Sequence, residues 1–225
     1  MRYLNKKVFI NSAAIRYSEV QLDGNIHLIG TQGVGKSTIL RAILFFYNAD
    51  TQRLGIPVEK KSYQDYYFPY ADSSIIYEVA REDGWFTVLS YKTMNRICYR
   101  FIASPYRPDL FIDEEGAPYP SDRIRSVLDK NGIKYSGAIS TYEEYRNILY
   151  GNSDNKRDYS CYSLMESGSY QNIIRTIQNV LLNSRLEADY IKQTIITSLN
   201  EADSVIDLSR YRSHLSGFEA QLNEI

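Results

Sequence analysis

The feature that most constrains this chain is a glycine-rich segment, Gly30–Thr38, which reads Gly-Thr-Gln-Gly-Val-Gly-Lys-Ser-Thr. It matches the pattern Gly-x-x-x-x-Gly-Lys-Ser, in which glycines let several backbone N–H groups point at one anion. An apolar run over Ile26–Ile29 precedes the segment, and a helical pattern over Lys36–Tyr47 follows it. Strand, glycine-rich turn and helix is the context in which this motif holds phosphate groups. The sequence therefore predicts a nucleoside triphosphate site.

Backbone and side chains of this segment have different expected roles. The backbone N–H groups, together with the positive end of the following helix dipole, are expected to surround the phosphates. Lys36 would reach the outer phosphates, and the Ser37 hydroxyl would hold Mg²⁺. The expected ligand-binding residues are Gly30, Thr31, Gln32, Gly33, Val34, Gly35, Lys36, Ser37 and Thr38.

Composition and charge describe a folded domain with no general affinity for polyanions. Hydrophobic residues make up 44% and charged residues 24% of the 225 residues, as in ordinary globular proteins. The formal net charge of −1 gives no attraction of the whole chain to nucleic acid or to an anionic membrane. A DNA contact would need a local patch, and two sets of residues are candidates: Arg96, Arg100 and Arg107, or Arg123, Arg125, Lys130 and Lys134. Solvated faces are the simpler interpretation.

Cysteine use and hydropathy favour a cytoplasmic protein. Cys98 and Cys161 form neither a paired motif nor a disulfide framework, which is typical of a reducing compartment. The N-terminal segment has no apolar signal core, and no apolar run reaches membrane-spanning length. His27 and His214 are far apart in the sequence, and we interpret both as structural rather than as metal ligands.

Strand patterns dominate the beginning and the middle of the chain. Asp23-Gly24 and Asp83-Gly84 are turn signals of the kind found between antiparallel strands. The predicted strands are Lys7–Ile10, Tyr17–Leu22, Ile26–Ile29, Ser74–Arg81, Trp85–Tyr91, Arg96–Ala103, Leu110–Asp113 and Tyr159–Met165.

Helical patterns lie between and after these strands. The helix over Lys36–Tyr47 is apolar nearly all round, so we expect it to be buried beneath a sheet. Ser121–Lys130 carries apolar residues on one face, which predicts a surface helix. Thr141 and Glu144 form a capping box that begins a further helix, which ends near Gly151.

The C-terminal part changes to a heptad pattern. A long helical region runs from about Ile173 to Leu199, and apolar residues then repeat at spacings of 3 and 4 from Leu208 to Leu222. We therefore divide the chain into an N-terminal lobe, residues 1–200, and the start of a coiled-coil helix, residues 201–225. An amphipathic helix packed on the domain is the alternative.

Hydrolysis of a triphosphate also needs carboxylates near Mg²⁺, and these are hard to find in the sequence. Asp113-Glu114 follows a short apolar run, Leu110–Ile112, as an acidic catalytic motif would. Glu115-Gly116 turns the chain directly afterwards, which favours a hairpin tip. We therefore expect the catalytic carboxylates to lie elsewhere.

Two other functions fit parts of the sequence. A small GTPase-like switch would use Gly30–Ser37, Asp113–Gly116 as Asp-x-x-Gly, and Asn155–Asp158 as Asn-Lys-x-Asp. The last motif follows a polar loop instead of a buried strand, and the antiparallel strands in the middle fit poorly with an alternating core. A non-catalytic interaction module, with a purely structural loop, is the other alternative.

The order of these elements resembles the N-terminal half of an SMC-type ATPase head, from the structural-maintenance-of-chromosomes proteins and their relatives. Short strands lead to Gly30–Thr38, a buried helix follows, then an antiparallel lobe and a helix that enters heptads at Leu208. The resemblance covers nearly the whole chain, but only the loop is specific in sequence. It implies an α/β fold of α+β character, with a mixed sheet, an antiparallel β lobe and a C-terminal helix that enters a coiled coil.

The same resemblance implies function and partners. ATP and Mg²⁺ would be the ligands, with Lys36 and Ser37 in the roles given above. Gln171 would be the family's Q-loop glutamine, a catalytic residue that contacts Mg²⁺ or the attacking water. Gln32 stands where many such heads have Asn. The partners implied are a complementary C-terminal half-head, a second head in a homodimer, and DNA.

Overall fold

The structure is a computed structural model that describes residues 2–24, 26–48, 51, 54, 56, 61–94, 96–151 and 159–164. Several predictions fall on residues outside these ranges, so the structure does not describe them. They are the helix over 173–199, the heptads from Leu208, the domain boundary at residue 200, Asn155–Asp158 and Gln171.

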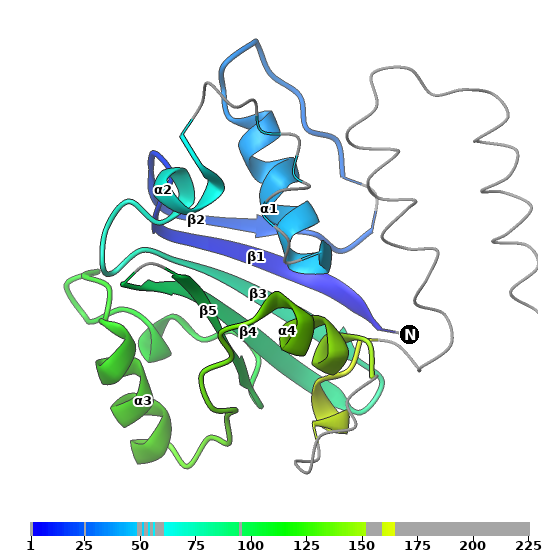
Figure 1. Cartoon of the computed structure of the whole chain (residues 1–225), viewed down its shortest axis with the longest axis vertical. Helices are drawn as coiled ribbons and strands as arrows, with labels where there is room; N and C mark the ends of the chain where they lie inside the picture. The colour runs from blue at the N-terminus through cyan, green and yellow to red at the C-terminus, as the bar shows by residue number, and fades with distance from the viewer. Residues whose placement is uncertain are drawn as a thin grey trace, which may run out of the picture. The chain divides into compact units, whose positions relative to one another are not determined.

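A five-stranded sheet with the strand order β2-β1-β3-β4-β5 forms the centre of the described part (Figure 1). Every pair of neighbouring strands in it is antiparallel, so the mixed sheet that the sequence predicts is here an antiparallel one. The α+β character of the fold is confirmed. The strands are β1 (Tyr3–Ser12), β2 (Ile15–Gln21), β3 (Ser74–Arg81), β4 (Gly84–Thr93) and β5 (Arg96–Ile102).

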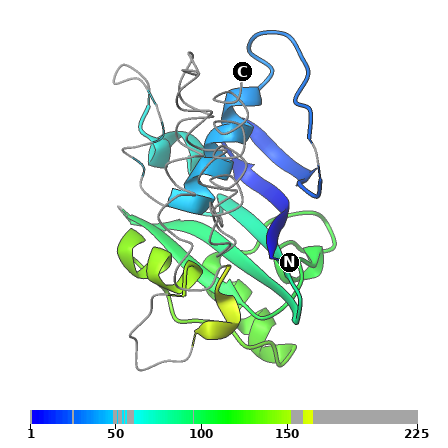
Figure 2. The same cartoon turned by 90° about the vertical axis from the view of Figure 1, so that its right-hand side faces the viewer.

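Both faces of this sheet are apolar, because successive side chains of a strand point to opposite faces. Different helices cover the two faces. In β3, Ile75 and Tyr77 belong to one apolar cluster and Ile76 to the other. Figure 2 shows α1 and α4 on one side of the sheet and α3 on the other. The helices are α1 (Lys36–Asn48), α2 (Tyr63–Tyr67), α3 (Ser121–Lys130) and α4 (Tyr142–Leu149).

The predicted helices are confirmed where the structure describes them. α1 begins at Lys36 as the loop motif requires, and α3 has the predicted bounds. The Thr141 side chain accepts a hydrogen bond from the Glu144 backbone N–H, which begins α4 as the capping box predicts. α2 lies within a segment rich in aromatic residues, for which we predicted no helix.

The predicted strand at Ile26–Ile29 is wrong. Residues 26–31 have no regular secondary structure, and β2 pairs with β1 as the edge of the sheet. Ile29 is 91% exposed, so among the described residues this apolar run does not pack against a strand. A short apolar run forms a strand only where a neighbouring strand is available to pair with it. The local sequence does not show whether such a partner exists.

Two other predicted strands are also wrong. Pro108–Leu110 forms a 3-10 helix, and only the isolated bridge between Ile112 and Pro118 remains of the expected strand pair. Ser160–Tyr162 is likewise a 3-10 helix. Both segments are irregular in backbone but bury aromatic and apolar side chains. Their composition therefore resembles that of a strand.

The backbone carbonyls of helix α1 accept hydrogen bonds from side chains of neighbouring elements. Buried tyrosine hydroxyls donate hydrogen bonds to these oxygens from α2, β3 and α4, and Tyr150, directly after α4, does the same. The last carbonyls of a helix have no partner within the helix, so the bonds to Phe46 and Tyr47 serve as a C-terminal cap. The donor–acceptor pairs are Tyr67–Thr38 at 2.9 Å, and Tyr77–Ala42, Tyr145–Phe46 and Tyr150–Tyr47 at 2.7 Å.

A buried lysine makes a similar bond from the sheet. Lys7 in β1 is fully buried, and its Nζ donates to the Ile39 carbonyl at 2.9 Å. The ammonium also lies 4.5 Å from the centre of the Phe9 ring. Burial lowers the pKa of Lys7 from 10.5 to about 7, because water no longer solvates the charged form.

We expect this lysine to make stability depend on pH above neutrality. Between pH 7 and the ordinary lysine pKa, the unfolded chain binds a proton that the folded chain has lost. The free energy of unfolding should therefore rise with pH, by up to about 1.4 kcal/mol per unit, from about pH 7 to about pH 9. Above that window the buried tyrosines, which ionise more easily when unfolded, oppose the rise. Urea unfolding at several pH values measures this slope.

The matched comparison is Lys7→Met against Lys134→Met, a substitution at an exposed lysine. The slope should disappear in Lys7→Met and persist in Lys134→Met. An equal slope in all three proteins would contradict the assignment of the pH dependence to Lys7.

The hydroxyl bonds to α1 give a second prediction. Tyr145→Phe keeps the ring but leaves the buried Phe46 carbonyl without its donor, which should lower the free energy of unfolding by about 1–2 kcal/mol. Tyr142→Phe in the same helix is the control, because Tyr142 is 51% exposed and should change stability by less than about 0.5 kcal/mol. Chemical denaturation of both variants measures the difference, and equal stabilities would contradict the capping role.

Candidate functional site

The glycine-rich loop connects the segment after β2 to the first residue of α1. Gly33 and Gly35 have φ angles of +88° and +92°, in the region where residues with a side chain are strained. These two angles explain why the motif needs glycine at those positions. They turn the chain tightly into α1, which begins at the next residue, Lys36.

The end of α1 that meets the loop favours an anion. The first turn of α1 contains no acidic residue, and its backbone bond from Ile39 N–H to the Gly35 carbonyl begins the helical ladder. The earlier N–H groups of a helix have no partner within it and carry the positive end of the dipole. With no acidic side chain to neutralise it, this end of α1 is suited to a phosphate group.

Lys36 lies over the loop rather than extending away from it. Its Nζ donates hydrogen bonds to the carbonyls of Gly30 and Thr31, both at 2.6 Å. An ammonium has three protons, and these bonds use two of them. The cation is therefore held beside the loop, where an incoming phosphate would meet it.

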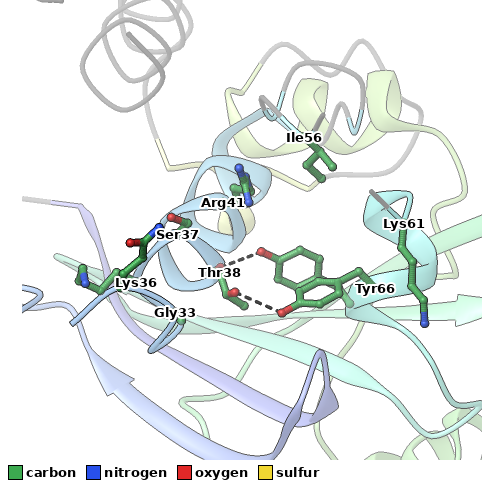
Figure 3. Close-up of a pocket in the computed structure, with 11 residues that line it drawn as sticks. Gly33, Lys36, Ser37, Thr38, Arg41, Ile56, Lys61 and Tyr66 are labelled. Atoms are coloured by element: carbon green, nitrogen blue, oxygen red, sulfur yellow. Dashed lines mark hydrogen bonds between the residues drawn. The ribbon is translucent and has the colours of Figure 1, made fainter. Parts of the chain in front are cut away.

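A cavity of about 780 Å³ opens beside the loop and the first turns of α1 (Figure 3). Its size lies in the range of small-molecule sites. Loop and helix residues form one wall, and residues after α1 form the other. The lining residues are Gln32, Gly33, Gly35, Lys36, Ser37, Thr38, Arg41, Ile56, Lys61, Tyr66 and Tyr67.

The charges around this cavity have one sign. Lys36, Arg41 and Lys61 are cationic, and none of the described lining residues is acidic. The exposed Ser37 hydroxyl also lines it and is a suitable oxygen ligand for Mg²⁺. The cavity thus offers cations, backbone N–H groups and a hydroxyl to a polyphosphate, without a described carboxylate that could take part in hydrolysis.

Most of the predicted loop residues reach this cavity, and the others do not line it. Gln32, Gly33, Gly35, Lys36, Ser37 and Thr38 line it, whereas Gly30, Thr31 and Val34 are exposed parts of the loop outside the lining. Arg41, in α1, was not predicted to line the cavity, and neither was the opposite wall, which consists of Ile56, Lys61, Tyr66 and Tyr67. The sequence feature that could have indicated this wall is the cluster of tyrosines shortly after α1.

A family model covers this region and nearly all of the chain. It is described as "Protein of unknown function (DUF3584)", and it matches residues 12–216. The chain belongs to this family. A search of curated proteins found no match. The match includes the glycine-rich loop and every residue that lines the cavity.

In this family member Asp113 has a structural role in a turn. Its carboxylate accepts hydrogen bonds from the backbone N–H groups of Glu115 and Ala117, and the Gly116 N–H donates to its carbonyl. Asp113 does not line the cavity. The turn expected at Asp113 is therefore confirmed. An acidic catalytic motif, or the Asp-x-x-Gly motif of a GTPase, would require this carboxylate beside the glycine-rich loop, and it does not line the cavity there.

Of the two basic sets considered for DNA contact, Arg96, Arg100 and Arg107 do not form one exposed patch, whereas Arg123, Arg125, Lys130 and Lys134 are all exposed. Arg100 is buried, with its guanidinium 5.0 Å from the centre of the Tyr135 ring. Arg107 is exposed and pairs with Asp109. Among the described residues there is also no group of acidic, histidine or cysteine side chains that could hold a metal ion.

Over the residues that the structure describes, no helix is both long and apolar enough to cross a membrane. Cys98 is buried and Cys161 is exposed.

Proposed function

We propose that this chain binds Mg²⁺ and ATP through Gly30–Thr38, as the N-terminal half of an SMC-like ATPase head. The observation that carries the proposal is the cavity itself. It joins the glycine-rich loop to Lys36, Arg41 and Lys61, and its described lining contains no carboxylate. Such a site suits the binding of a polyphosphate, and its described lining offers no carboxylate of the kind that hydrolysis requires.

The residues of the site have distinct roles in this proposal. Lys36 binds the outer phosphates, the loop N–H groups surround the inner ones, and the Ser37 hydroxyl holds Mg²⁺. Mg²⁺, when bound, neutralises charge on the phosphates. Gln171, which lies outside the described residues, would contact Mg²⁺ or the attacking water, as the family resemblance implies.

Hydrolysis would require a complementary C-terminal half-head that supplies the signature and acidic motifs. Two completed heads would then enclose the nucleotide between them, which makes the assembly a homodimer through its heads. ATP binding would close the heads and hydrolysis would open them, moving coiled coils on DNA in chromosome organisation, repair or defence. This part of the proposal rests on the resemblance alone.

Substitution of the loop lysine tests the binding part. Lys36→Ala removes a charge directed at phosphate, so we expect ATP affinity to fall by about 10- to 100-fold while the fold is retained. Isothermal titration calorimetry in the presence of Mg²⁺ measures the affinity, and circular dichroism checks the fold. Lys134→Ala, at an exposed lysine away from the cavity, should bind as the wild type does. Unchanged ATP affinity in Lys36→Ala would contradict the site.

Turnover by the chain alone tests the second part. Because the described lining lacks a carboxylate, we expect negligible release of phosphate from ATP by this chain in isolation. A phosphate-release assay at saturating ATP measures it. Robust hydrolysis that is lost in Asp113→Asn would show that the turn at Asp113 has been misinterpreted.

A panel of nucleotides distinguishes the alternatives. A preference for GTP that Asp158→Asn abolishes would favour the GTPase-like switch. No binding of any nucleotide at millimolar concentration with Mg²⁺ would favour the non-catalytic interaction module.

A further inference from the structure

The cavity beside the loop has two chemically different ends. The glycine-rich loop and Lys36 form a polar, cationic end. Ile56, Tyr66 and Tyr67 form an apolar and aromatic one, with the Lys61 side chain beside it (Figure 3). A simple polyphosphate would use only the first end. A nucleotide also has two ends, an anionic chain of phosphates and a flat aromatic base.

Tyr66 is the accessible member of a group of packed tyrosine rings. Tyr63 and Tyr67 are stacked with ring centres 4.1 Å apart, and both are almost fully buried. Tyr66 packs against Tyr67 at 5.1 Å in an edge-to-face arrangement and remains 38% exposed. Its ring is therefore supported by neighbours and open to a ligand at the same time.

The position of this ring relative to the phosphate loop is fixed through Thr38. The Tyr67 hydroxyl donates to the Thr38 carbonyl at 2.9 Å, and the Tyr66 hydroxyl lies 3.4 Å from Thr38 Oγ1. Figure 3 shows both interactions as dashed lines from Thr38 toward the two rings. Since Thr38 is the last residue of the loop motif, the aromatic wall is tied directly to the phosphate-binding wall.

We propose that the Tyr66 ring stacks on the base of the nucleotide whose phosphates the loop binds. This inference rests on the proposed function, and it adds that the ligand is an aromatic nucleotide rather than any polyphosphate. Stacking on an aromatic side chain tolerates different bases, because every base has a π-face. Tyr66 therefore contributes to affinity for nucleotides in general rather than to a choice between adenine and guanine.

The test compares ATP, GTP and inorganic tripolyphosphate as ligands in calorimetric titrations at matched ionic strength with Mg²⁺. Tyr66→Ala should weaken both nucleotides by about tenfold or more, and leave tripolyphosphate within about twofold of the wild type. Tyr66→Phe, which keeps the ring and removes the hydroxyl near Thr38, should bind all three ligands as the wild type does. Tyr70→Ala is the matched control, because Tyr70 is 62% exposed and lies outside the cavity lining.

The outcomes separate this inference from the proposed function. Wild-type binding of ATP that Tyr66→Ala leaves unchanged would overturn the stacking role and keep the proposed function. An equal loss of tripolyphosphate and ATP affinity in Tyr66→Ala would also overturn it, since the ring would then support the loop. Failure of the wild type to bind either ligand would overturn both proposals.

Discussion

The hydrogen bonds that surrounding side chains donate to the carbonyls of α1 are the interaction on which the rest of the structure depends. They come from β1, α2, β3 and α4, and from Tyr150 after α4, so two strands and two helices are linked directly to α1. Burial raises the pKa of Tyr77 and Tyr145 well above the ordinary value, which keeps both hydroxyls protonated as donors. Because α1 begins at the end of the glycine-rich loop, the same bonds fix the helix end to which the loop is attached.

This arrangement explains why the chain uses tyrosine where other cores use phenylalanine. The sequence contains 21 tyrosines and 8 phenylalanines. A phenyl ring would fill the same space, but the hydroxyls of Tyr67, Tyr77, Tyr145 and Tyr150 also satisfy carbonyl oxygens that the packing removes from water. Apolar packing and hydrogen bonding are therefore combined in single residues on the α1 face of the sheet.

Much of the fold could be predicted from the sequence where the signals were local. The capping residue Thr141, the turn at Asp83-Gly84 and the glycine pattern of the loop each depend on a few neighbouring residues. The strand at Ile26–Ile29 could not be judged in this way, because a strand needs a partner that lies elsewhere in the chain. The aromatic wall of the cavity was missed for the same reason, since only folding brings Tyr66 beside Thr38.

The bond between the Tyr67 hydroxyl and the Thr38 carbonyl has one more consequence. It joins the two walls of the cavity across space, so the width of the cavity is set by a side chain and a helix carbonyl rather than by the length of the connection between α1 and α2. A relative with a longer or shorter connection would keep the same opening as long as it retained this donor and the helix that accepts from it. Variation in that connection is therefore compatible with a cavity of constant width.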